Sequence, residues 1–164
     1  MTLFKVNASS ASSTNKIFLR VLFSFLLVIW ILGFASLSIF QSSFAVIISP
    51  FLKKIYAAVC HQIDYKTINF FGQKLFVCSR CTGIYFGAFL SSFYLIFDSR
   101  KIGLKNSFLL AASILIIMDV VFYSIGLYEY SKSIAFITGL FFGSIVFVYI
   151  LIIIEKFLFH FDEV

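Results

Sequence analysis

Charged residues are scarce in this chain, and their scarcity excludes an ordinary soluble domain. Only 12% of its 164 residues are Asp, Glu, Lys or Arg, whereas 62% are hydrophobic. A soluble domain carries about 25% charged residues, because it needs them to cover its surface. The chain also contains several apolar runs long enough to cross a bilayer. We therefore expect an all-α integral membrane protein whose apolar surface is covered by lipid.

Proline and cysteine are also rare, so each one that occurs is informative. The single proline, Pro50, follows Ser49, and a Ser-Pro pair is typical of a helix start. Three cysteines cannot all pair within one chain, so at least one is free, metal-bound or bonded elsewhere. The net charge of +6 is spread over loops and helix ends. The positive-inside rule and contacts with anionic lipid headgroups explain basic residues at these places. We therefore expect no nucleic-acid partner.

The apolar runs divide the chain into a membrane domain, residues 17–156, and two tails. The predicted spans are residues 17–40, 82–97, 107–127 and 133–154. Residues 1–16 include a polar run without apolar periodicity and are predicted to form a flexible tail, and residues 157–164 form the C-terminal tail. A signal peptide is the alternative for the first run. The apolar core of this run is longer than the roughly 7 to 15 apolar residues of a signal peptide, so we favour a retained membrane anchor.

The polar segment 41–81 is predicted to hold an amphipathic helix and a hairpin outside the bilayer. Apolar residues recur at helical spacing after Ser49-Pro50, with two lysines on the opposite side, as in a helix that lies at the membrane surface. Residues 65–70 and 74–77 flank Phe71-Gly72-Gln73, which predicts a short hairpin. Cys60 and His61 follow at the end of the helix, and Cys78 follows the hairpin.

Basic residues in the short connections predict the orientation. The loop 98–105 contains three basic residues and the turn 128–132 contains one, while Lys16 and Arg20 lie beside the first span. The positive-inside rule then places both termini and the loop 98–105 in the cytoplasm. The segment 41–81, with its cysteines, is expected on the extracytoplasmic side.

A six-residue pattern occurs twice. The sequence TGIYFG at 82–87 is matched by TGLFFG at 138–143, and each opens a predicted span. Two related helical hairpins would produce this pattern, and so would chance similarity between Gly- and Phe-rich helices. Gly-x-x-x-Gly lets two helix backbones approach closely. Gly83, Gly87, Gly139 and Gly143 are therefore predicted to contact neighbouring helices, including those of a homo-oligomer.

The residues best suited to chemistry are three cysteines and one histidine. Cys78 and Cys81 form a Cys-x-x-Cys pair directly after the predicted hairpin, and this spacing on a turn can direct both thiolates at one metal ion. Cys60 and His61 complete a set of up to Cys₃His, which suits zinc or another thiolate-binding metal. Adjacent residues on a helix point in different directions, so Cys60 and His61 share an ion only if the helix ends there. A three-cysteine site with His61 as an outer partner is the alternative.

The same cysteines also permit redox chemistry. At the start of a helix, the helix dipole and Arg80 would stabilise a thiolate at Cys78 or Cys81 and make a disulfide between them exchangeable. The protein would then be a membrane thiol–disulfide oxidoreductase, and whether it is an enzyme stays open. A structural disulfide or inert cysteines form the simplest alternative. We prefer the metal site because ligation explains a histidine beside Cys60 better than thiol exchange does.

Asp119 lies inside the third predicted span, where a carboxylate is costly and is therefore a functional candidate. We place it about 12 Å from the outer end of the span, at 1.5 Å per residue. It either pairs with Arg80 and supports the cysteine site, or joins neighbouring helices through Tyr85, Thr82 or Thr138. A small transporter or assembly subunit that relies on Asp119 is a third function to consider.

Two blocks of residues resemble a known family signature. They are Cys60-His61-Gln62 and CSRCTGIYFG at 78–87, with Gly72 between them. Over roughly 51–143 the chain resembles domain-of-unknown-function family 2085. The resemblance implies a multi-span protein of a bacterial or archaeal inner (cytoplasmic) membrane, and it supplies no activity. Members carry an arginine shortly after Cys-His-Gln, where this chain has Asp64-Tyr65-Lys66, and another ahead of the later Thr-Gly, where it has Lys132.

Overall fold

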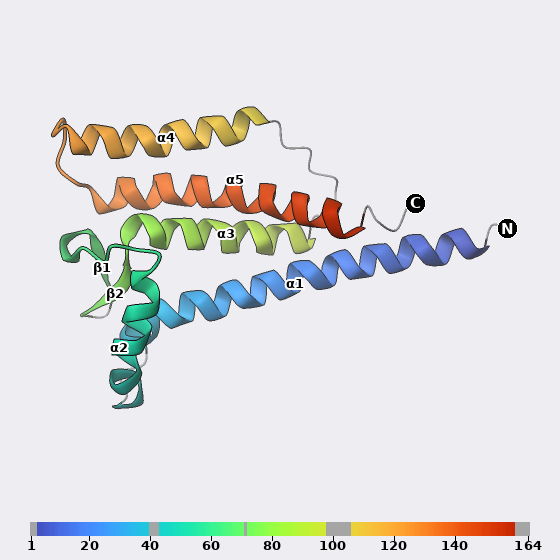
Figure 1. Ribbon diagram of the computed structural model, residues 1–164, viewed down its shortest axis with the longest axis horizontal. Helices are drawn as coiled ribbons and strands as arrows, with labels where there is room; N and C mark the ends of the chain where they lie inside the picture. Colours follow the sequence, from blue (N-terminus) through green and yellow to red (C-terminus); the bar gives the residue numbers. More distant parts are fainter. Residues whose placement is uncertain (1–2, 40–42, 71, 98–105, 160–164) are drawn as a thin grey trace.

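Long apolar helices dominate the fold, as the composition requires (Figure 1). The computed structural model describes residues 3–39, 43–70, 72–97 and 106–159. The elements are α1 (Leu3–Ile39), α2 (Ser43–Ala57), the 3₁₀ helix η1 (Asp64–Lys66), β1 (Thr67–Phe70), β2 (Gln73–Cys78), α3 (Ser79–Phe97), α4 (Asn106–Ser124) and α5 (Lys132–Phe159). Four segments are long and apolar enough to cross a membrane: Asn15–Ser36, Ser79–Phe97, Asn106–Ser124 and Lys132–Leu158. The all-α membrane class is confirmed.

The spanning helices pack in the order α1, α3, α5, α4. The contact between α3 and α5 is by far the largest, while α1 packs mainly on α3 and α4 mainly on α5. Figure 1 shows α3 and α5 running in one direction and α1 and α4 in the other. The start of α1 and the end of α5 therefore lie at one end of the molecule. The hairpin, α2 and the α4–α5 turn lie at the other end, here called the hairpin end.

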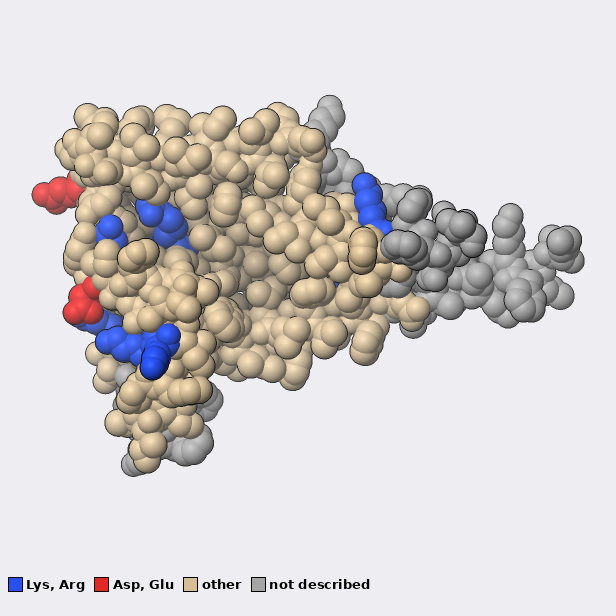
Figure 2. Space-filling model, in the orientation of Figure 1, with Lys and Arg blue, Asp and Glu red and all other residues tan. Residues whose placement is uncertain are grey.

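The surface agrees with a bilayer around the middle of the helices. On the face shown in Figure 2, most of the charged side chains lie at the hairpin end. One further basic side chain lies toward the opposite end, and the broad region between them is uncharged. Large hydrophobic side chains of all four spanning helices are exposed there, and lipid would cover them.

Glycines allow the close contact between α3 and α5. A Cβ atom on Gly83 or Gly87 would collide with backbone atoms of α5, and one on Gly139 or Gly143 would collide with backbone atoms of α3. The two Gly-x-x-x-Gly faces thus pack against each other within the chain. The prediction that these glycines contact a neighbouring helix is confirmed within the chain, and a homo-oligomer stays a prediction.

Arg20 joins α1 to α3 and α5. Its guanidinium donates to both carboxylate oxygens of Glu155, at 2.7 and 3.1 Å, and to the carbonyl of Leu95 at 2.6 Å. Leu95 lies in the last turn of α3, where carbonyl oxygens lack a partner within the helix. The side chains of Arg20 and Glu155 are only 9% and 14% exposed. One arginine therefore satisfies a buried acid and a helix end at once.

α2 lies across the end of α1, roughly perpendicular to the spanning helices, as expected of an interfacial helix (Figure 1). It begins at Ser43 and contains Pro50, so the predicted start at Ser49-Pro50 is wrong. Pro50 has no amide hydrogen and leaves the carbonyl of Val46 without its helical donor. The Ser49 hydroxyl donates to that carbonyl at 2.9 Å. Ser49 thus supports a proline inside the helix instead of capping its start.

Other helix ends also differ from prediction. α1 begins at Leu3, so residues 3–16 are helical where we predicted a flexible tail, because a formed helix extends at little cost into adjacent alanines and serines. α4 ends at Ser124, before the predicted 127, and α5 continues to Phe159, past the predicted 154. The predicted basic loop 98–105 lies outside the described residues, as do residues 160–164 of the predicted tail.

The predicted hairpin is confirmed. β1 and β2 are antiparallel, with Phe70 opposite Gln73 and Thr67 opposite Cys78. Gly72 has a φ of 79°, a left-handed conformation that glycine adopts without strain. β2 then packs on α1 and α2 in a small core. The buried members of this core are Phe34, Ala35, Tyr56, Cys60, Leu75, Phe76 and Val77.

Candidate metal centre

Three cysteine side chains meet at the hairpin end. The Sγ atoms of Cys60, Cys78 and Cys81 all lie within 4.8 Å of one another. All three thiols are free. A tetrahedral site with metal–sulfur bonds of about 2.3 Å would hold its sulfurs somewhat less than about 4 Å apart. Small side-chain movements would therefore bring all three sulfurs onto one ion.

Cys60 is positioned by the end of α2. The helix ends at Ala57, and the amide of Cys60 donates to the carbonyl of Tyr56 at 2.9 Å. Gln62 adopts a φ of 49°, which is uncommon for a residue with a side chain. The side-chain Nε2 of Gln62 donates to the backbone carbonyl of Lys53 at 2.7 Å and holds this turn against the helix. The chain thus reverses just after Cys60, whose side chain stays in the core at 5% exposure.

Cys78 and Cys81 lie where β2 passes directly into α3. Cys78 is the last residue of β2, and Cys81 is in the first turn of α3. The amide of Cys78 donates to the sulfur of Cys60 at 3.2 Å. The hydroxyl of Thr82 donates to the carbonyl of Cys78 at 3.0 Å. The positive end of the helix dipole and a backbone N–H therefore both favour negative charge on this cluster.

Neighbouring thiols alter the acidity of Cys60. Hydrogen bonds from the Cys78 thiol first, and from the Cys81 thiol second, hold the pKa of Cys60 well below its usual range, against the opposing effect of burial. A thiolate is the form of cysteine that ligates metals and attacks disulfides. The cluster therefore favours one reactive sulfur even without an ion.

The structure brings together three of the four predicted ligands. His61 is exposed, and its ring is not among the ligand atoms that meet at the cluster. The reversal after Cys60 directs the two neighbouring side chains differently. The arrangement agrees with the three-cysteine alternative, and a tetrahedral ion there would have one position that no cysteine fills.

Arg80 pairs with Asp119, as one of the two predictions for this carboxylate stated. The Nη2 of Arg80 donates to one carboxylate oxygen, and the hydroxyl of Tyr128 donates to the other. The side chains of Arg80 and Asp119 are 21% and 5% exposed. Asp119 lies five residues before the end of α4 at Ser124, or about 7.5 Å at 1.5 Å per residue. It is shallower than expected because α4 is shorter than predicted.

Tyr85, the other residue singled out from the sequence, faces α1. Its ring centroid lies 6.0 Å from that of Trp30 and 5.9 Å from that of Phe34. It packs beside Cys81 on the core that contains Cys60. Tyr85 therefore borders the cysteines as a packing residue, on the side of α3 that contacts α1.

A cluster of tyrosines beside the site was missed by the sequence analysis. The Nζ of Lys66 lies 4.4, 5.2 and 5.4 Å from the ring centroids of Tyr123, Tyr130 and Tyr65. The hydroxyls of Tyr65 and Tyr123 are hydrogen-bonded at 2.6 Å, and those of Tyr130 and Ser79 at 2.7 Å. We call Tyr65, Tyr123 and Tyr130 the tyrosine cage. The available signal was the three tyrosines within residues 123–130.

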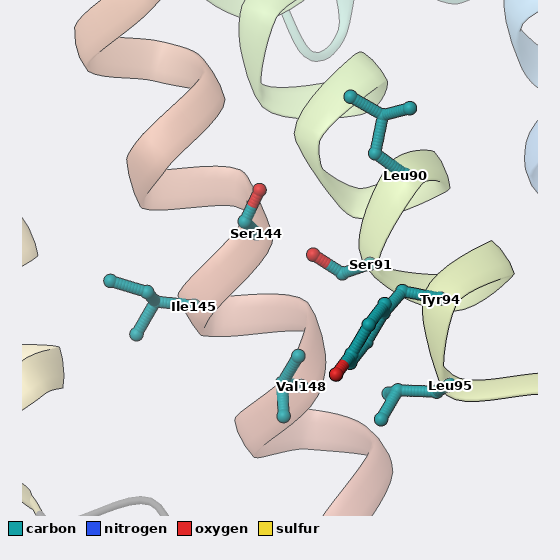
Figure 3. Close-up of a pocket in the computed structure, with 7 residues that line it drawn as sticks. All are labelled: Leu90, Ser91, Tyr94, Leu95, Ser144, Ile145 and Val148. Carbon is teal, nitrogen blue, oxygen red and sulfur yellow. The ribbon is translucent and has the colours of Figure 1, made fainter. Parts of the chain in front are cut away.

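A groove of about 310 Å³ lies between α3 and α5 (Figure 3). It is lined by Leu90, Ser91, Tyr94, Leu95, Ser144, Ile145 and Val148. Most of its wall is apolar, and the Ser144 hydroxyl already donates to the carbonyl of Leu140 at 2.8 Å. The groove lies along the later half of α3 and the middle of α5, away from the cysteines. It is suited to apolar contact with lipid, and the cysteine cluster is the stronger candidate for chemistry.

Comparison with known proteins agrees with the resemblance in the two cysteine blocks. A family model described as "Predicted membrane protein (DUF2085)" matches residues 60–149, which include all three cysteines and Asp119. An uncharacterized protein of Methanocaldococcus jannaschii is 35% identical over 144 residues, covering 84% of this chain and 92% of that protein. An uncharacterized protein of Methanothermobacter thermautotrophicus is 50% identical over 36 residues, covering 22% of this chain and 32% of that protein.

Both of these relatives come from archaea, within the bacterial or archaeal range that the resemblance implied. No solved structure matches the chain. The family model covers more than half of the chain, and the first relative is similar over nearly its whole length. The chain therefore belongs to domain-of-unknown-function family 2085, a family of membrane proteins.

Proposed function

We propose that this membrane protein binds one transition-metal ion through Cys60, Cys78 and Cys81. The observation that supports the proposal is the meeting of three free thiols, from two separate segments, within 4.8 Å. Thiolates select soft or borderline metals such as zinc. Zinc is our first choice, because its tetrahedral sites accept three thiolates with a histidine or a water as the fourth ligand. A movement of His61 toward the ion would fill that position.

We further propose that the site faces the outside of a prokaryotic cytoplasmic membrane. The hairpin end carries the cysteines, and the start of α1 and the end of α5 lie at the opposite end (Figure 1). The basic residues of the predicted loop 98–105 support a cytoplasmic location for that opposite end. Thiol labelling of intact cells with an impermeant reagent tests this orientation. Labelling only after lysis would place the site in the cytoplasm.

Metal analysis of the purified protein tests the central proposal. The full chain is purified without oxygen, and bound metal and free thiols are measured for the wild type, Cys78→Ser and His61→Ala. We expect one metal ion per chain, lost in Cys78→Ser and retained with weaker affinity in His61→Ala. Cobalt substitution would show sulfur-to-cobalt charge-transfer bands and d–d bands with the intensity of a tetrahedral site. A wild-type protein that binds neither zinc nor cobalt would overturn the proposal.

A thiol–disulfide oxidoreductase is the second candidate function. It is favoured by the location of Cys78 and Cys81 at the start of α3, with Cys60 close enough to exchange with either. Oxidation of the pair by a membrane quinone would form one disulfide and transfer two electrons and two protons to the quinone, giving the quinol. The same thiol measurement separates the candidates. A metal-free protein with one free thiol and a reducible Cys78–Cys81 disulfide would support the redox function.

A further inference from the structure

We propose that Lys66 and the tyrosine cage form a clamp that positions the two halves of the cysteine site. One half is the segment that carries Cys60, and the other is the turn that carries Cys78 and Cys81. The clamp closes when the Lys66 ammonium group enters the cage. Its role in metal affinity rests on the proposed function, whereas its effect on the exposure of Cys60 does not.

The geometry of the cage suits an ammonium group. The rings of Tyr65 and Tyr130 are perpendicular at 90°, with centroids 6.1 Å apart, and those of Tyr123 and Tyr130 meet at 74°, with centroids 5.4 Å apart. Three differently oriented ring faces thus surround one cation, as in aromatic cages that bind alkylammonium groups. Another lysine nearby, the exposed Lys74 of β2, instead pairs with Asp64 at 3.4 Å.

The cage contacts both halves of the site. Lys66 ends η1, which follows the Cys60 turn, and the next residue, Thr67, pairs with Cys78 across the hairpin. On the other side, the hydroxyl of Tyr130 bonds to that of Ser79, a fully buried residue in the Cys-x-x-Cys turn. An ammonium group held between these contacts therefore ties the Cys60 segment to the start of α3.

The α4–α5 turn provides the rigid side of the clamp. It carries Tyr130, and also Tyr128, which bonds to the same Asp119 carboxylate as Arg80. The cysteine turn is thus held through Ser79 by Tyr130, and through Arg80 by Asp119 of α4, which Tyr128 also contacts. From the Cys60 side, Tyr65 reaches the cage through its hydroxyl bond to Tyr123, and Lys66 reaches it through its ammonium group. Removing its charge should loosen that side and leave the other contacts intact.

Three variants of the full chain, in detergent or nanodiscs, test the clamp. Lys66→Met keeps the length and apolar stem of the side chain but removes the charge, and Lys66→Arg keeps a cation. Lys74→Met is the matched control, because Lys74 lies on the adjoining hairpin but outside the cage. The first readout is the alkylation rate of Cys60 in metal-free protein, measured by mass spectrometry. The second is zinc affinity, measured by competition with a chelator.

We expect Lys66→Met to raise the alkylation rate of Cys60 and to weaken zinc binding, each by about threefold to tenfold, the range for a partly exposed cation–π contact. Lys66→Arg should stay within about twofold of wild type, and Lys74→Met should equal it. Normal alkylation in Lys66→Met would overturn the clamp, and so would equal defects in Lys66→Met and Lys66→Arg. If the wild type binds no metal, the proposed function fails, and the alkylation rates still decide about the clamp.

Discussion

Arg20 and Arg80 form buried ion pairs at opposite ends of the molecule, and the two pairs differ in completeness. Arg20 donates from all three guanidinium nitrogens, to Glu155 twice and to Leu95 once. Arg80 donates to Asp119 from one nitrogen, and its buried Nε has no hydrogen-bond partner among the described residues. Both arginines join helices that are far apart in the sequence. Only Arg80 lies within a Cys-x-x-Cys turn.

The difference affects the free energy of each contact. A buried donor without a partner costs free energy, so native proteins keep few of them. The complete pair at Arg20 needs no role beyond joining α1, α3 and α5. The incomplete pair at Arg80 leaves a buried Nε without a partner among the described residues, on a residue that lies between Cys78 and Cys81 in the sequence.

The largest effect is expected at the complete pair. Arg20→Met leaves the Glu155 carboxylate buried without a partner and should lower the free energy of unfolding by about 3 to 5 kcal/mol. Replacing both residues by methionine should recover much of this loss, because no charge is then left buried. Denaturant unfolding in detergent measures both effects. Metal content of the folded fraction should equal that of wild type, and its loss would show that the two ends are coupled.

A smaller loss of stability is expected at the incomplete pair, together with an effect on the site. Asp119→Leu removes the charged acceptor of Arg80 and should lower the free energy of unfolding by about 2 kcal/mol, the value of a charged hydrogen bond. Asp119→Asn keeps an acceptor and should lose less. Zinc affinity should change in Asp119→Leu, although no thiol is removed. Unchanged affinity with reduced stability would make Asp119 a structural residue only.

The smallest effect depends on pH and concerns Tyr128. Its hydrogen bond to the Asp119 carboxylate raises the pKa of Tyr128 to about 12. Since the folded pKa exceeds the ordinary value of about 10, the stabilisation is complete below about pH 10 and is lost as the pH rises through 12. Tyr128→Phe should lower the free energy of unfolding by about 1 kcal/mol at neutral pH. The difference from wild type should disappear toward pH 12.

The Arg20→Met variant provides the control for this titration. Tyr128 and its hydrogen bond to Asp119 are present both in that variant and in wild type, so the difference between the two proteins should stay constant over the same range. A Tyr128→Phe difference that persists at pH 12 would contradict the assigned hydrogen bond.

Local patterns in the sequence predicted most of the fold. Long apolar runs identify spanning helices whatever their neighbours are, and Gly72 between two short apolar stretches identifies the hairpin. Pro50 misled us, because a Ser-Pro pair begins a helix in one setting and lies inside one in another. The deciding contact was the hydrogen bond from Ser49 to Val46, which the spacing of residues does not reveal.

The candidate site was predicted in part. Cys78 and Cys81 lie in one turn. The polar segment between Cys60 and Cys78 is short, so the sequence could predict that Cys60 lies close to them. His61 was expected to join the cluster, and α2 does end before it, but the His61 side chain is exposed and its ring lies outside the group of sulfurs. The tyrosine cage was missed because its residues come from η1, α4 and the α4–α5 turn. Periodicity within one element contains no signal for such a set.

The sequence by itself determined the membrane class, the spans, the hairpin and the residue types of a thiolate site, because these depend on composition and on short spacings. Only the tertiary structure decided which ligands meet, how Gly-x-x-x-Gly faces are used and what holds each buried arginine. Those contacts join residues distant along the chain, such as Arg20 and Glu155 or Lys66 and Tyr130. Their energies depend on burial and geometry that form only when the helices pack.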